Sequence, residues 1–179
     1  EEKAFEVVVT NTNKVADMCE RIRPISPEKC PPHIPGCEED IKRITFEKAH
    51  ELYLMNKINI FLGGDHSISI GTQKAFIEYA KKINKEPVVI HLDAHPDICD
   101  FYDNSYYSHA CTVKRAIDNG FKCENINLIG IRGFEEQEVD YFNNNPNISV
   151  YTSKMIKDEG YNKMLDEIIS KYQDKKYVI

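Results

Sequence analysis

The sequence predicts an α/β protein in which a parallel sheet is covered by helices on both faces. Three observations support this fold class. Short apolar strands alternate with amphipathic helical patterns throughout the chain, which is the order of a parallel sheet. The segment Val88–Leu92 is apolar on both faces, as a strand buried in such a sheet is. Polar residues also follow two of the predicted strands, where open α/β sheets bind their ligands.

The composition is that of an ordinary globular protein. Of the 179 residues, 41% are hydrophobic and 29% are charged, so we expect one domain over residues 1–179. The net charge of -6 gives no basic surface, which argues against a nucleic-acid partner. No apolar run reaches the roughly 20 residues that cross a bilayer, and no signal peptide is recognisable. We therefore expect a cytoplasmic protein without a membrane partner.

The N-terminal third is interpreted from apolar patterns and prolines. The β-branched run Phe5–Thr10 predicts a strand, and Asn11–Asn13 offers cap chemistry for a helix through Ile22. Five prolines within Pro24–Gly36 exclude regular structure, so this segment is predicted to be a loop or linker. The amphipathic pattern of Glu38–Asn56 then predicts a helix.

The remaining elements alternate between strand and helix. Glycines are expected to end or interrupt the helices at Gly120 and Gly160. In chain order we expect a strand at Ile58–Leu62, a helix from Ser67 to about Ile83, the strand Val88–Leu92, a polar and aromatic loop at Asp97–Tyr107, a helix at Ser108–Asn119, a strand at Asn125–Ile131, a helix at Glu135–Phe142, a strand at Ile148–Tyr151, a helix at Ser153–Lys171 and a strand beginning at Lys175.

The central strand ends in three residues with ligand chemistry. Asp93, His95 and Asp97 occupy alternate positions, so in extended backbone they point to one side, roughly 6.6 Å apart. Pro96 cannot donate to a ladder, so the strand should end near it. Two carboxylates and an imidazole form a ligand set suited to Mn²⁺, Fe²⁺ or Zn²⁺. His91 lies in the strand itself and is expected to be a hydrogen-bonded core residue.

Two further histidines strengthen the prediction of a metal centre. The strand Ile58–Leu62 opens into Gly63-Gly64-Asp65-His66-Ser67, which places His66 at the exit of the strand. The sequence Ser108-His109-Ala110-Cys111 opens the helix that follows the aspartates. Three histidines at strand ends or a helix start, together with two carboxylates, favour a metal site over an Asp-rich turn with an incidental histidine.

These three motifs, in this order and spacing, resemble those of the ureohydrolases, the arginase/agmatinase family. Ile129-Gly130-Ile131-Arg132-Gly133 fits the next strand of that family, and the resemblance runs from about Glu38 to the last residue. Ser108-His109 at a helix start and the later Ile-Arg-Gly look more like agmatinase than arginase. The resemblance implies a three-layer α/β/α fold, a binuclear Mn²⁺ centre and a homo-oligomer, a trimer or hexamer.

The resemblance also implies a role for each matching residue. His66 and Asp97 would bind one metal ion and His95 the other, with Asp93 bridging the two. His109 would protonate the leaving amine, and Asp65 and Ser67 would support the ligands from behind. The implied reaction is hydrolysis of a guanidinium C–N bond by a metal-bridging hydroxide. Acting on agmatine, a small cationic substrate, it would yield urea and putrescine, a step of polyamine biosynthesis.

The sequence departs from the family in one respect. In the family an Asp-x-Asp motif supplies two more ligands, on a strand that begins with residues like Lys176–Ile179, where this sequence stops. It therefore carries four of the six expected ligand positions, and we expect a sheet that is incomplete at the C-terminus, with an exposed edge. One interpretation is that the chain is part of a functional hydrolase. The alternative is that it is a catalytically inactive metal-binding or oligomerisation module.

The motifs do not decide which guanidino compound is the substrate. Arginase, guanidinobutyrase and formimidoylglutamase are alternatives to agmatinase. The loop Asp97–Tyr107 should contact the end of the substrate away from the guanidinium, with Asp100, Asp103 and Asn104 as candidate contacts. A carboxylate there would accept the cationic chain of agmatine.

Overall fold

The computed structural model describes residues 3, 6–11, 13–14, 37–174 and 176–178. The chain divides into two compact units, residues 1–34 and residues 35–179. The predicted Pro24–Gly36 loop and most of the helix predicted through Ile22 lie outside the described residues, and a single domain over 1–179 stays a prediction. Within the described residues, no helix is both long and apolar enough to cross a membrane.

The strand predicted at Phe5–Thr10 is wrong. Residues Glu6–Thr10 form a short π-helix, η1. The first unit contains no other described strand with which this segment could form a ladder. A helix satisfies its backbone groups within the segment, which an unpaired strand cannot do.

The second unit is built on parallel strands, as predicted. β2 (Val89–Leu92), β3 (Ile126–Ile131) and β4 (Ser149–Thr152) form a three-stranded sheet in the order β2-β3-β4. Both of its ladders are parallel. β1 (Glu86–Pro87) pairs in parallel with β5 (Tyr177–Val178), so the strand predicted near the last residues is confirmed.

The helices confirm most of the predicted boundaries. Helix α5 (Thr112–Asn119) ends just before Gly120, whose φ of 121° suits glycine. Gly160, with a φ of 86°, separates α7 (Ser153–Glu159) from α8 (Tyr161–Tyr172). The helices of this unit are α3 (Cys37–Tyr53), α4 (Ile68–Lys82), α5 (Thr112–Asn119), α6 (Glu136–Asn144), α7 (Ser153–Glu159) and α8 (Tyr161–Tyr172), with short 3-10 turns η2 (His109–Cys111) and η3 (Cys123–Asn125).

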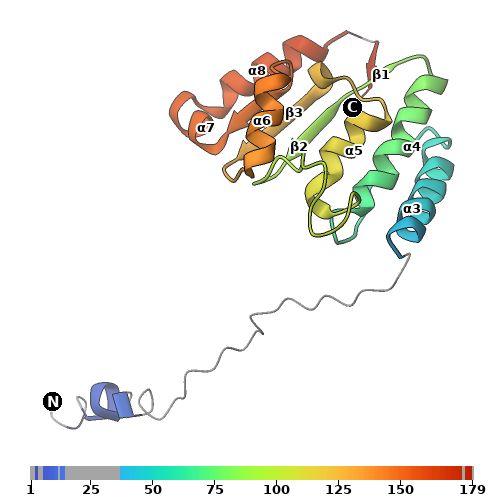
Figure 1. The fold of residues 1–179 in the computed structure, drawn as a ribbon. Helices are drawn as coiled ribbons and strands as arrows, with labels where there is room; N and C mark the ends of the chain where they lie inside the picture. The colour runs from blue at the N-terminus through green and yellow to red at the C-terminus, as the bar shows by residue number, and fades with distance from the viewer. Residues whose placement is uncertain (1–2, 4–5, 12, 15–36, 175, 179) are drawn as a thin grey trace. The chain divides into compact units, whose positions relative to one another are not determined.

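Helices cover both faces of the three-stranded sheet, which gives the predicted three layers (Figure 1). The core on the side of α4, α5 and α6 consists of Ile77, Ile98, Val113, Ala116, Phe121, Ile126, Leu128, Ile131 and Ile148. The core on the side of α8 consists of Val88, Ile129, Met164, Ile168 and Tyr172. The strand β3 is therefore buried on both faces, and the predicted ligands Asp93, His95 and Asp97 follow the carboxyl end of its neighbour β2.

The strand predicted at Ile58–Leu62 is not formed. The segment is extended, but it has no strand partner within the described part of the chain. The side chains of Ile58, Ile60 and Leu62 are 97%, 82% and 92% exposed. Apolar alternation predicts a strand only where a ladder is available, and here none of the described strands lies alongside.

Candidate metal centre

The turn after β2 is fixed to the exit of β3 by backbone hydrogen bonds. The Asp93 N–H donates to the Ile129 carbonyl at 3.1 Å. The N–H groups of Arg132 and Gly133 donate to the Ala94 carbonyl at 2.9 and 3.1 Å. Because β3 is buried, these bonds tie the turn that carries the predicted ligands to the core of the sheet.

Asp97 is held by the start of helix α5. Its backbone φ is 52°, a left-handed conformation that is uncommon for residues other than glycine. Its carbonyl accepts the N–H groups of Val113 and Lys114 at 2.9 and 3.3 Å, within the first turn of α5. The Asp97 side chain is only 8% exposed, so its carboxylate lies at the bottom of the site.

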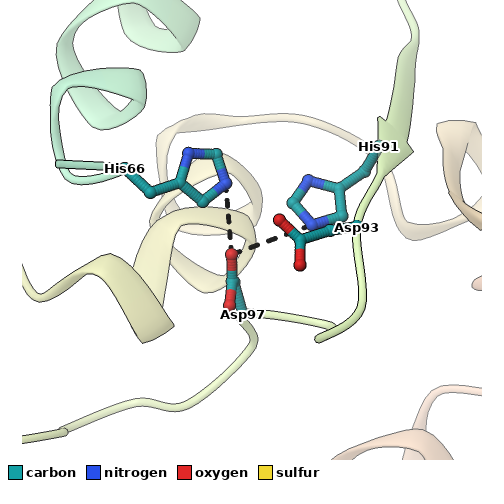
Figure 2. A group of neighbouring side chains, drawn as sticks. All are labelled: His66, His91, Asp93 and Asp97. Atoms are coloured by element: carbon teal, nitrogen blue, oxygen red, sulfur yellow. Dashed lines mark ion pairs between the residues drawn. The ribbon is translucent and has the colours of Figure 1, made fainter. Parts of the chain in front are cut away.

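Four side chains converge at this end of the sheet (Figure 2). Ligand atoms of His66, His91, Asp93 and Asp97 all lie within 4.8 Å of one another. His66 comes from the turn before α4, and its Nε2 lies 3.1 Å from Asp97 Oδ2. His91 Nε2 lies 3.8 Å from the same oxygen. The structure thus brings together three of the four predicted ligands and adds His91.

The donor set fits a divalent cation. His66 Nε2 is buried and has no hydrogen-bond partner in the described residues, although it lies next to the Asp97 carboxylate. Contact with Asp97 raises the pKa of His66. For Asp93, burial would raise the pKa, but the backbone N–H of His95 and other neighbours outweigh it, so the pKa lies below its usual value. An imidazole nitrogen beside two carboxylates is a donor set that Mn²⁺, Fe²⁺ or Zn²⁺ binds.

His91 is buried and hydrogen-bonded, and it also lies against the cluster. Its Nε2 is 3.2 Å from the His95 carbonyl, and its ring stacks on that of His66 with 5.5 Å between centroids. Burial lowers the pKa of His91. Since Nε2 is engaged with a carbonyl oxygen, His91 supports the turn and the ring of His66. Its position two residues before Asp93, on the same side of a strand, was the sequence signal for this proximity.

His95, the fourth predicted ligand, stands apart from the cluster. Its side chain is 66% exposed, and Nδ1 lies 3.7 Å from Asp93 Oδ1. Its ring lies against Gly133, where an added Cβ would come within 2.9 Å of Cδ2. A cavity of about 310 Å³ adjoins it, lined by His95, Asp97, Tyr102, His109, Ala110, Gly133, Phe134, Glu135 and Glu138. The predicted catalytic His109 therefore faces the same cavity as His95 and Asp97.

His109 is fixed by its neighbours at the start of η2. The Ser108 hydroxyl accepts the Ala110 N–H at 3.4 Å and lies 3.3 Å from His109 Nδ1. The ring of His109 meets Tyr102 edge to face, with centroids 5.5 Å apart. This packing keeps the imidazole at the wall of the cavity.

The direct partner of His66 is Ser69, which the sequence analysis did not identify. The Ser69 hydroxyl lies 3.1 Å from His66 Nδ1. Asp65 and Ser67, predicted to support the ligands, hydrogen-bond to each other, through both the N–H and the hydroxyl of Ser67. They shape the turn that presents His66. Spacing of three residues at a helix start is the signal that could have identified Ser69.

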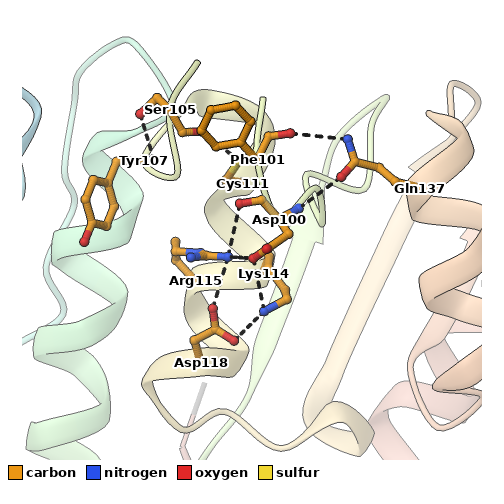
Figure 3. Close-up of polar contacts among 9 residues, drawn as sticks. All are labelled: Asp100, Phe101, Ser105, Tyr107, Cys111, Lys114, Arg115, Asp118 and Gln137. Atoms are coloured by element: carbon orange, nitrogen blue, oxygen red, sulfur yellow. Dashed lines mark hydrogen bonds and ion pairs between the residues drawn. The ribbon is translucent and has the colours of Figure 1, made fainter. Parts of the chain in front are cut away.

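The loop residues predicted to contact substrate, Asp100, Asp103 and Asn104, are not among the residues that line this cavity. Figure 3 shows Asp100 beside Arg115 and Lys114 of α5. Asp100 forms an ion pair with Arg115 and lies 3.6 Å from Lys114 Nζ. The Arg115 guanidinium, by this contact, holds the pKa of Asp100 below its usual value. Asp103 and Asn104 form an exposed turn with φ of 50° and 61°. Their roles in substrate binding stay predictions.

Glu138 is a buried residue of the site that the sequence analysis missed. It is 3% exposed and lines the cavity of His95 and His109. Its Oε1 accepts the Ile98 N–H at 3.0 Å, and its Oε2 accepts the Glu135 N–H at 2.9 Å. The first bond joins α6 to the residue directly after Asp97. It spans 40 residues of sequence, so no local pattern could have revealed it.

The chain is similar to several ureohydrolases and, over a short stretch, to a DNA polymerase. The agmatine ureohydrolase of Thermoplasma volcanium has 28% identity and a TM-score of 0.62, over 73% of this chain and 42% of that enzyme. Formimidoylglutamase from Bacillus subtilis has 25% identity and a TM-score of 0.67, over 80% of this chain and 44% of that enzyme. Arginase 2 of Arabidopsis thaliana is 37% identical over 78 residues, 44% of this chain and 22% of that protein.

A fourth match is to a different class of protein. DNA polymerase III PolC-type of Caldanaerobacter subterraneus subsp. tengcongensis is 53% identical over 53 residues, 30% of this chain and 4% of that polymerase. The chain spans less than half the length of each of these four relatives. The family model of the arginase family matches residues 9–179, which is nearly the whole chain. The chain therefore belongs to the arginase family.

Proposed function

We propose that this chain forms the metal-binding part of a manganese-dependent ureohydrolase that cleaves a guanidinium C–N bond. The observation that carries the proposal is the convergence of His66, Asp93 and Asp97 from two segments of the chain at one sheet edge. Family membership supports the reaction class. The match to the DNA polymerase covers only 4% of that enzyme, so it does not support a polymerase activity.

In this proposal His66 and Asp97 would hold one ion and His95 a second, and Asp93 would be a ligand shared by both. Bound Mn²⁺ would supply a water molecule acidic enough to lose a proton near neutral pH. The first position is better formed, because Asp97 is buried and next to His66. His95 is mostly exposed and lies outside the cluster of His66, Asp93 and Asp97. We therefore expect the second ion to bind more weakly.

His109 is proposed to donate the proton that the leaving amine requires. An imidazole is suited to this step because its ordinary pKa lies near neutral pH. Its position on the wall of the same cavity as His95 and Asp97 supports this role. Its edge-to-face contact with Tyr102 also supports it, because the contact restrains the ring.

Agmatine is the proposed substrate, with urea and putrescine as products. The Ser108-His109 motif and the similarity to an agmatine ureohydrolase support agmatine. Arginine, guanidinobutyrate and formiminoglutamate are the alternatives, and the similarity to an arginase and a formimidoylglutamase favours testing them side by side. We further propose a cytoplasmic homo-oligomer, a trimer or hexamer by resemblance to the family.

The test is urea or formamide release from each of the four compounds, with and without added Mn²⁺. The proposal predicts Mn²⁺-dependent urea release that is fastest with agmatine. Mn²⁺ binding is measured in parallel, because it distinguishes a functional hydrolase from a catalytically inactive metal-binding module. Binding of Mn²⁺ without turnover of any of the four would support the inactive metal-binding module instead.

A further inference from the structure

The loop that follows Asp97 is tied to the start of helix α3, which is distant in the sequence. The Ser105 hydroxyl donates to Glu38 Oε2 at 2.6 Å, across 67 residues, a length typical of a charge-assisted O–H···O⁻ hydrogen bond. One turn further along α3, Lys42 Nζ lies 3.9 Å from the centroid of the Tyr107 ring. Residues four apart share one face of a helix, so Glu38 and Lys42 present one face of α3 to this loop.

The Ser105 hydroxyl is a buried group with two partners. Ser105 is 7% exposed. Its hydroxyl accepts the Tyr107 N–H at 2.9 Å (Figure 3) and donates to Glu38. Within the described residues this hydroxyl donates to no acceptor other than Glu38. A buried donor without an acceptor is destabilising, so the conformation of the loop depends on the Glu38 carboxylate.

A tight two-residue turn joins Ser105 to Tyr102. Each of these two residues donates its N–H to the carbonyl of the other, both at 3.0 Å. The residues between them, Asp103 and Asn104, have φ of 50° and 61°. Positive φ at both central positions is what a type I′ turn requires, and Asp and Asn are favoured there. The position of Ser105 therefore sets the position of the Tyr102 backbone.

Tyr102 in turn packs against the proposed proton donor. Its ring meets the His109 imidazole edge to face, with 5.5 Å between centroids. His109 is exposed, and its other side-chain contact is with the hydroxyl of the adjacent Ser108, 3.3 Å from Nδ1. An exposed side chain samples several rotamers unless a neighbour restrains it. The contact with Tyr102 is therefore the restraint on the His109 ring that comes from outside its own turn.

We propose that Glu38 is a positioning residue for His109, acting through Ser105 and the turn that carries Tyr102. Glu38 belongs neither to the metal cluster nor to the lining of the cavity that His109 faces, so its effect on His109 passes through the loop. The catalytic meaning of this arrangement rests on the function proposed above, in which His109 protonates the leaving amine. The contact between the two rings does not depend on that function.

The experiment is NMR spectroscopy of the full chain with isotope-labelled histidine and tyrosine. Nuclear Overhauser effects between the rings of Tyr102 and His109 report their contact, and Tyr102→Leu identifies these signals. Glu38→Ala should weaken them, because the Ser105 hydroxyl loses its acceptor. Glu38→Gln keeps an acceptor oxygen and should retain most of the signal. Asp40→Asn is the matched control, since Asp40 lies in the same first turn of α3 and pairs with Arg43 of that helix.

A double-mutant cycle connects the effect to this hydrogen bond. Ser105→Ala should weaken the ring contact by itself, and Glu38→Ala added to it should cause little further loss, because both changes remove the same bond. In a chain that releases urea with Mn²⁺, Glu38→Ala should also lower kcat by as much as about 100-fold, the effect of a misplaced catalytic group. KM and the Mn²⁺ stoichiometry should stay unchanged.

Several results would overturn the proposal. One is an unchanged ring contact in Glu38→Ala, in a chain whose circular dichroism matches that of the unmodified chain. Equal losses in Glu38→Ala and Asp40→Asn, additive losses in the cycle, or an unchanged kcat in Glu38→Ala would overturn it as well. Absence of urea release from the unmodified chain would instead contradict the proposed function, because the ring contact is measured without substrate.

Discussion

Removing the buried carboxylate of Glu138 should destabilise this protein far more than any exposed carboxylate would. Each oxygen accepts one backbone N–H, from Ile98 at 3.0 Å and from Glu135 at 2.9 Å. The Glu135 side chain in return accepts the Glu138 N–H, which completes a capping box at the start of α6. Glu138→Ala leaves both amides without acceptors in a site that is 3% exposed.

The magnitude follows from these two bonds. A hydrogen bond to a charged group contributes about 1.5–3 kcal/mol, so the loss of both bonds in Glu138→Ala should lower the free energy of unfolding by about 3–6 kcal/mol. Glu138→Gln keeps one acceptor oxygen and should lose roughly half as much. Domains of this kind are typically stable by about 5–15 kcal/mol, so the alanine variant should be close to unfolding.

The assay is urea unfolding followed by far-UV circular dichroism, with linear extrapolation to water. Glu136→Ala is the matched control, because Glu136 is exposed in the same helical turn and should change stability by no more than about 0.5 kcal/mol. A Glu138→Ala variant as stable as the Glu136→Ala control would refute the assignment of Glu138 as the link between α6 and the Asp97 turn.

Three further predictions concern other parts of the chain. Burial raises the pKa of Tyr53 to about 12, so the stability that depends on its protonated hydroxyl is complete below pH 10 and is lost as the pH rises toward 12. Unfolding measured at stepped pH should show a fall in the free energy of unfolding above pH 10 that Tyr53→Phe removes. Cys99 and Cys111 are fully buried, and burial raises the pKa of the Cys99 thiol to about 12, so a thiol reagent with peptide mapping should label them only after denaturant is added. His109→Ala should retain Mn²⁺ but slow urea release by about 10²–10⁴-fold, and unchanged turnover would exclude His109 as the proton donor. His95→Ala should weaken both metal binding and activity, and unchanged Mn²⁺ stoichiometry would exclude His95 as a ligand.

The sequence predicted the parts of the fold that depend on local pattern. Strands β2, β3 and β4 were recognisable because they are apolar on one or both faces, and the helix break at Gly160 followed from glycine itself. Phe5–Thr10 and Ile58–Leu62 carry the same apolar signal, but neither forms a strand. A strand requires a partner at its edge, and the partner is a property of the whole chain.

In the candidate site, too, residues within a local pattern were predicted, and contacts between distant segments were not. Asp93 and Asp97 were predicted from alternation along one strand exit, and His66 from the turn that precedes α4. Glu138 contributes from 40 residues away through a backbone hydrogen bond, which no spacing rule detects. Asp100 was expected at the substrate, but Arg115 of α5 pairs with it, a contact that depends on how the loop folds over that helix.

The central claim is that His66, Asp93 and Asp97 hold a divalent metal ion, and titration of the full chain with Mn²⁺ tests it most directly. Isothermal calorimetry should show binding that His66→Ala weakens at least about tenfold. His50→Ala is the matched control, since His50 lies on α3 beside Glu78 and outside the cluster. Equal Mn²⁺ affinity in the His66→Ala and His50→Ala variants would contradict the metal centre described above.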